Sequence, residues 1–158
     1  GAKISGRPGG KAALAAAAPP ILRVLAKSHQ FLTFTTPPNL QHAVAYGLGK
    51  DDAYFAQMRG DLQKSRDHFC KGLAECGFPI LPSQGTYFVN VDLASVGVTD
   101  DAAFCMNLVK EHGVAAIPVS AFYAENAVKS VVRFCFAKKN ETLDAALERL
   151  HKVLRRTA

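Results

Sequence analysis

The chain has 158 residues, of which 49% are hydrophobic and 20% are charged, a composition typical of a globular domain with a buried core. Its formal charge of +6 suits an anionic cofactor, an acidic small molecule or nucleic acid, but the basic residues are spread along the sequence. No apolar run is long enough to cross a membrane, and the four cysteines show no paired CxxC spacing. We therefore predict a cytoplasmic protein with reduced thiols, without a metal site and without a membrane anchor.

The first twenty residues differ from the rest, and we predict a domain boundary after them. Residues 1–20 form an irregular leader rich in glycine and alanine, made basic by Lys3, Arg7 and Lys11. A glycine-rich basic loop can hold a phosphate, although this one does not match the GxxxxGK[ST] pattern of nucleotide-binding loops. The alternative is a disordered basic tail. Residues 21–158 are predicted to form one small domain.

Hydrophobic periodicity predicts five helices in the remaining chain. They run from Pro20 toward His29, from Asn39 to Leu48, from Asp51 or Asp52 to Gly77, from Asp100 to Gly113, and from about Glu141 to Leu154. Three strands alternate with the later helices, at residues 86–91, 114–119 and 130–138. The expected fold class is α/β, close to α+β, with a short sheet of about three strands and helices packed on one face.

The third predicted strand carries one charge among apolar residues. Alternation places Arg133 on one face with Val131 and Cys135, and places Val132 and Phe134 on the face toward the core. A permanent cation on a strand needs water, a carboxylate or a ligand. Arg133 is therefore either solvated or paired with a local acid, or it receives the carboxylate of a small substrate through its planar fork.

Three motifs occur in an order and spacing that resemble the carboxy-terminal part of class I/II (fold-type I) pyridoxal-phosphate-dependent aminotransferases. The motifs are Gly85-Thr86-Tyr87-Phe88, the run from His112 to Tyr123, and the run from Val132 to Lys138. The nearest branch resembles the methionine, glutamine-phenylpyruvate and kynurenine aminotransferases. The resemblance covers about residues 20–156 and implies the small domain of such an enzyme.

This resemblance implies roles for three basic residues. In the family, the arginine of the third motif binds the α-carboxylate of the amino-acid substrate, and this role falls on Arg133. A lysine upstream forms the Schiff base with pyridoxal 5'-phosphate, and a basic residue eight positions later contacts the phosphate. Lys3 and Lys11 have that spacing and are the implied cofactor residues, with Lys3 also acting as catalytic acid and base. The neighbouring residues depart from the family pattern, so the leader is either a remnant of the cofactor-lysine segment or foreign.

The same resemblance sets the expected function. It implies transfer of an amino group between a neutral amino acid, sulfur-containing or aromatic, and a 2-oxo acid, by a homodimer. Phe122 and Tyr123 are expected either to line the substrate side-chain pocket or to lie in the core. The family's cofactor pocket is built mainly by a preceding large domain, so we expect this chain to be a fragment that is inactive by itself.

Two other functions remain open from the sequence. The chain could be a non-catalytic interaction module derived from the small domain, with Arg133 in a structural role. A nucleic-acid-binding role is suggested by the overall charge and by basic residues near the carboxyl end, which are Arg149, Lys152, Arg155 and Arg156. No aromatic residues accompany that basic face, so no nucleic-acid partner is predicted.

Overall fold

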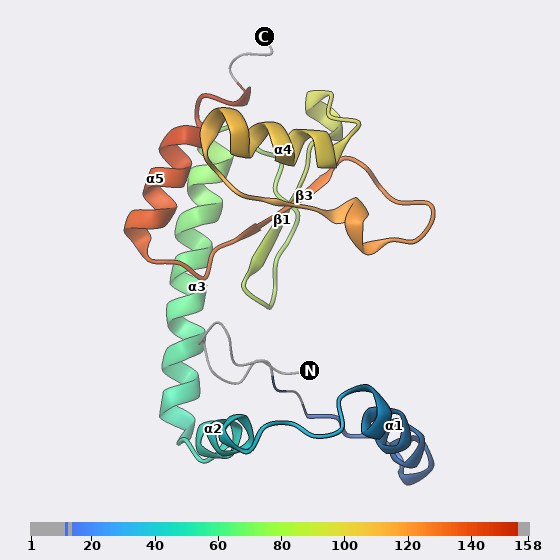
Figure 1. Cartoon of the computed structure of the whole chain (residues 1–158). Coiled ribbons are helices and arrows are strands. Elements are labelled where there is room, and N and C mark those ends of the chain that lie inside the picture. The colour runs from blue at the N-terminus through green and yellow to red at the C-terminus, as the bar shows by residue number, and fades with distance from the viewer. Residues whose placement is uncertain (1–11, 13, 155–158) are drawn as a thin grey trace. The chain divides into compact units, whose positions relative to one another are not determined.

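The computed structural model describes residue 12 and residues 14–154 (Figure 1). The chain divides into two compact units, residues 1–56 and residues 57–158, which are described separately. The boundary lies in the second turn of the helix α3 (Asp52–Glu75). None of the described helices is long and apolar enough to span a bilayer.

The first unit contains the helices α1 (Pro19–Leu32) and α2 (Pro38–Leu48). Each begins with proline in its first turn, where the missing N–H costs no helical hydrogen bond. No residue of α1 is buried, and its apolar side chains are exposed. Its stability as a helix therefore does not come from packing within the described part of the chain.

The second unit contains the three predicted strands with three long helices, so the expected fold class is confirmed. After α3 it contains β1 (Phe88–Asp92), α4 (Asp101–His112), β2 (Ile117–Pro118), β3 (Val131–Cys135) and α5 (Asn140–Leu150). Two short 3-10 helices, η1 (Ala94–Val96) and η2 (Val119–Phe122), follow β1 and β2.

The sheet is antiparallel in the order β1-β3-β2, so β3 is the central strand. Val132 and Phe134 of β3 are buried against the helices, at 0% and 2% exposure, while Arg133 between them faces the other side. The three long helices each supply a buried pair to this core, namely Phe69 and Leu73, Cys105 and Leu108, and Leu143 and Leu150. The helices therefore cover one face of the sheet, and the predicted alternation along β3 is confirmed.

Both edges of the sheet differ from the centre. Outside β1, the backbone of residues 79–81 continues the pairing, because the N–H of Leu81 donates to the carbonyl of Asn90 and the N–H of Asp92 donates to that of Pro79. On the other edge, the strand predicted over residues 114–119 is reduced to Ile117–Pro118. Pro118 has no N–H to donate, and η2 begins at the next residue, so the ladder stops there.

The predicted boundaries of α4 are confirmed. Asp100 caps it by accepting a hydrogen bond from the N–H of Ala103 at 2.9 Å, and Gly113 ends it with a left-handed φ of 63°. The last helix is shorter than expected. It was predicted to reach Leu154, but α5 ends at Leu150 and the next residues form turns.

The helices α3 and α5 lie side by side (Figure 1), and Gly72 of α3 lies against Leu147 of α5. A Cβ atom at Gly72 would lie 2.8 Å or less from both methyl groups of Leu147 on α5. One turn away, His68 of α3 contacts Asp144 of α5, with Nε2 and Oδ1 2.6 Å apart. The absence of a side chain at position 72 thus leaves room for Leu147 between the two helices.

We expect Gly72→Ala to lower the free energy of unfolding by up to about 2 kcal/mol, because overpacking costs about 1–3 kcal/mol and the gain in helix propensity offsets about 1 kcal/mol of that cost. The measurement is the free energy of unfolding in urea. Gly60→Ala, in the same helix, is the matched control, because nothing lies within 4 Å of the added methyl group. That variant should be more stable than the unchanged protein. Equal effects of the two substitutions would contradict the close approach at Gly72.

Candidate functional site

Arg133 projects from the middle of the central strand on the face that the helices leave uncovered. In the register of the sheet it stands opposite Asn90 of β1 and opposite Ile117 of β2. Its side chain is half-buried. Two flanking strands therefore fix the backbone from which this cation extends.

The guanidinium group of Arg133 has neutral partners. Its Nε–H donates to Oδ1 of Asn90 at 3.1 Å. Its carbon Cζ lies 5.3 Å from the centre of the Phe88 ring and 4.9 Å from that of Phe122, within the range of a cation–π contact. Among the described residues, no carboxylate lies within 4.0 Å of its nitrogens. The charge is held in place but not neutralised, which leaves it able to bind an anion.

A pocket of about 270 Å³ opens beside this group. Arg133, Asn90 and Phe88 form one side of it, and the loop of residues 82–86 forms the other. The size and the single cation fit a small molecule that carries a carboxylate.

The loop over the pocket is held by several specific hydrogen bonds. The hydroxyl of Ser83 donates to the carbonyl of Phe88 at 2.9 Å, and Arg66 of α3 donates to the carbonyl of Ser83 at 3.1 Å. Thr86 has a φ of 65°, which is rare for a β-branched residue, and its hydroxyl oxygen accepts a hydrogen bond from the N–H of Phe88. Backbone strain of this kind persists where the surrounding structure holds it, and it is common at binding sites.

Phe122 reaches Arg133 because a buried carboxylate holds the segment before it. Asp101 in the first turn of α4 is only 1% exposed. Its two oxygens accept hydrogen bonds from the N–H of Ser120 at 2.8 Å and from the hydroxyl of Ser120 at 2.6 Å. Ser120 belongs to η2, two residues before Phe122, so Asp101 fixes the turn that carries the aromatic ring.

The structure brings together only part of the predicted site. Arg133 and Phe122 are neighbours, whereas the two candidate cofactor residues, Lys3 and Lys11, lie outside the described residues. Phe122 and Tyr123 are 59% and 53% exposed, so the alternative that they lie in the core is wrong. Their contact with a substrate side chain stays a prediction.

Three residues of the arrangement were missed by sequence reasoning. Phe88 and Asn90 lie in the predicted first strand, but their proximity to Arg133 depends on the pairing of β1 with β3. Asp101 directly follows the capping residue Asp100, and it contacts a residue 19 positions away. An acidic residue in the first turn of a helix is common on electrostatic grounds alone, so the sequence contained no signal for this contact.

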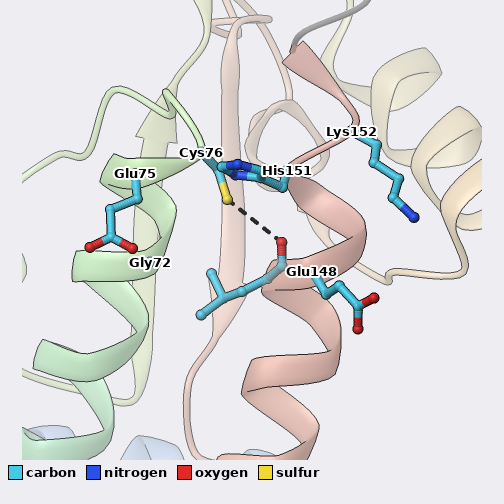
Figure 2. Close-up of a pocket in the computed structure, with 7 residues that line it drawn as sticks. Gly72, Glu75, Cys76, Glu148, His151 and Lys152 are labelled. Atoms are coloured by element: carbon cyan, nitrogen blue, oxygen red, sulfur yellow. Dashed lines mark hydrogen bonds between the residues drawn. The ribbon is translucent and has the colours of Figure 1, made fainter.

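Among residues 57–154, other features of the second unit show no comparable chemistry. A crevice between α3 and α5 is lined by Gly72, Cys76 and Leu147, and Figure 2 shows Glu75 and Lys152 directed away from one another there. The thiol of Cys76 donates to the carbonyl of Leu147 at 3.6 Å. Burial, together with the nearby Asp101, raises the pKa of Cys105 to about 11, so that thiol stays protonated at neutral pH. None of the four cysteines forms a disulfide bond; Cys76 and Cys105 are buried, whereas Cys70 and Cys135 are half-buried.

Comparison with known proteins identifies a family. A family model for aminotransferase class I and II matches residues 1–150. The methionine aminotransferase of Escherichia coli strain K12 is 40% identical over 145 residues, which are 92% of this chain and 38% of that protein. Kynurenine–oxoglutarate transaminase 1 of Homo sapiens is 33% identical over 154 residues, covering 84% of this chain and 36% of that protein.

Solved structures give the same result. The N-succinyldiaminopimelate aminotransferase from Mycobacterium tuberculosis superposes with a TM-score of 0.76 at 39% identity, over 85% of this chain and 35% of that chain. The resemblance seen in the sequence motifs, including its branch, is therefore confirmed. The chain spans between 35% and 38% of the length of these relatives.

We expect Asp101→Asn to lower the free energy of unfolding by about 1–3 kcal/mol, because the amide keeps one acceptor oxygen while its nitrogen cannot accept the second hydrogen bond from Ser120, which leaves a buried donor without its partner. Ser120→Ala is the matched control, since it removes only the hydroxyl and should cost about 1 kcal/mol. Urea unfolding measures both. If Asp101→Asn costs no more than Ser120→Ala, the carboxylate does not hold this turn.

Proposed function

This chain belongs to the class I and II aminotransferases, and we propose that it forms the part of such an enzyme that binds the α-carboxylate of an amino-acid substrate. The reaction we propose for the whole enzyme is amino-group transfer between a neutral amino acid and a 2-oxo acid. We propose that the whole enzyme acts in the cytoplasm as a homodimer.

The observation that carries this proposal is the unneutralised guanidinium group of Arg133 at the edge of a pocket. A planar fork fixed on a central strand can hold a carboxylate through two parallel hydrogen bonds. Fixing the carboxylate fixes the rest of a small amino acid, including the bond at Cα that has to react. A solvated surface arginine would not need the Asn90, Phe88 and Phe122 contacts that orient this one.

Support for a sulfur-containing or aromatic substrate comes from two sources. The relatives include proteins named for methionine and for kynurenine. Phe122 and Tyr123 expose apolar surface immediately after the turn that Asp101 holds. Such surface favours an apolar substrate side chain over a charged one.

Pyridoxal phosphate is the cofactor of this family, but the described pocket does not fit it. Its lining residues include no lysine, and Arg133 is their single cation, which suits a carboxylate. We propose that the cofactor is held by Lys3 and Lys11, outside the described residues. We therefore assign no step of the reaction to the residues around Arg133 beyond binding and orienting the substrate.

The alternative of a non-catalytic interaction module is favoured by α1, whose apolar residues Ile21, Val24 and Leu25 are 47% to 65% exposed. An interaction module would explain these exposed apolar residues as a surface that a partner protein covers. It would not require a pocket beside a cation without an acidic partner. The carboxylate-binding function therefore explains more of the second unit.

In an active aminotransferase that contains this chain, Arg133→Ala should raise KM for amino acids roughly 100-fold, because two charge-assisted hydrogen bonds of about 1.5 kcal/mol each are lost. Arg133→Lys keeps the charge but lacks the planar fork, so its KM should lie between those of the unchanged enzyme and of Arg133→Ala. Arg149→Ala is the control, because that arginine binds the carbonyl of Gly113 instead. An Arg133→Ala enzyme with the KM of the control would remove the assignment.

For the cofactor residue, reduction with sodium borohydride in the presence of pyridoxal phosphate should attach the cofactor to Lys3 in the same active protein. Peptide mass spectrometry locates the modification. Lys3→Arg should abolish it, and Lys11→Arg should weaken cofactor binding without moving the label. A label spread over other lysines in the unchanged protein would contradict the role of Lys3.

A further inference from the structure

The hydrogen bond between Arg133 and Asn90 uses one particular donor of the guanidinium group. A guanidinium offers five N–H donors along two edges that can hold a carboxylate by two bonds, the end-on edge of Nη1 and Nη2 and the side-on edge that includes Nε. In this structure Nε already donates to Oδ1 of Asn90 at 3.1 Å. The side-on edge is therefore occupied before any substrate arrives.

The other donors of Arg133 remain available. Within the described part of the chain, no hydrogen bond from its Nη1 or Nη2 is present, and the contacts with Phe88 and Phe122 involve ring systems rather than acceptors. The end-on edge is thus the one edge that still has both donors free. An anion that binds with two parallel bonds has to use it.

We propose that Asn90 is a positioning residue that reserves the end-on edge of Arg133 for the substrate carboxylate. This inference rests on the proposed function, and it adds which atoms receive the carboxylate and which residue selects them. Asn90 does not touch the substrate carboxylate in this arrangement. It acts by fixing the rotation of the guanidinium plane about the end of the side chain.

The neutrality of Asn90 is part of the same role. An aspartate at this position could accept the same hydrogen bond, but its charge would neutralise Arg133 and repel the incoming carboxylate. At an effective dielectric constant of about 20, two unit charges about 6 Å apart interact by roughly 3 kcal/mol, a factor of about 100 in affinity. An amide supplies the acceptor without that cost.

The test compares two substitutions of Asn90 in an active aminotransferase that contains this chain. Asn90→Asp keeps the acceptor and adds a charge, so KM for amino acids should rise roughly 10- to 100-fold. Asn90→Leu removes the acceptor for the Nε–H of Arg133, so KM should rise about three- to fivefold with kcat little changed. Leucine is well tolerated in a strand, so this variant should still fold. Asn107→Leu on α4, which does not line this pocket, is the matched control and should leave KM unchanged.

A spectroscopic readout separates positioning from mere folding. In the ¹⁵N NMR spectrum of the chain, the Nε–H signal of Arg133, assigned by its loss in Arg133→Lys, should exchange with water about fivefold faster in Asn90→Leu than in the unchanged chain, the factor expected for a hydrogen bond of about 1 kcal/mol. Asn107→Leu should leave this rate unchanged.

The outcomes distinguish this inference from the proposed function. If Arg133→Ala has no effect on KM, both fail. If Arg133→Ala raises KM but Asn90→Asp and Asn90→Leu do not, the carboxylate still binds Arg133 and the role of Asn90 is overturned. An Nε–H exchange rate that is the same with and without Asn90 would overturn it as well, whatever the kinetics show.

Discussion

The candidate site of the second unit depends on one cation, Arg133, whose side chain is oriented by neutral groups. Arg133 sits between two core residues of the central strand, so its backbone cannot move without disturbing the hydrophobic core. The amide of Asn90 and two aromatic rings hold its side chain without cancelling its charge. An acidic partner would have stabilised the arginine more simply but would have removed its affinity for anions. The arrangement therefore favours binding over self-pairing.

Two segments of the chain, one on each side of β3, support this arrangement. On the side of β1, the loop of residues 82–86 closes the pocket through Ser83 and the strained Thr86. On the side of β2, the buried carboxylate of Asp101 holds the turn that ends at Phe122. Neither segment contributes a charge to the pocket itself. Their contribution is geometric, since each limits where the aromatic rings and the guanidinium can lie.

The sequence was sufficient for features that depend on local periodicity. The alternation around Arg133 predicted which side of β3 faces the helices, and Asp100 and Gly113 predicted the ends of α4, because capping involves residues within one turn. It was insufficient where a contact joins distant segments. Asn90 reaches Arg133 only through the strand register, and Asp101 reaches Ser120 across the whole of α4. The length of β2 was also overestimated, because its apolar composition did not reveal that residues 114–116 stay outside the sheet or that η2 starts at Val119.

The two ends of the sheet have a consequence for the behaviour of the protein at high concentration. Exposed strand edges are templates on which further chains can pair and aggregate. Here the outer side of β1 is already paired with residues 79–81, and β2 offers two residues of which one is proline. Neither border presents a run of free backbone donors and acceptors. This three-stranded sheet is thus protected against recruiting a fourth strand from a neighbouring molecule, even while its other face stays open for a ligand.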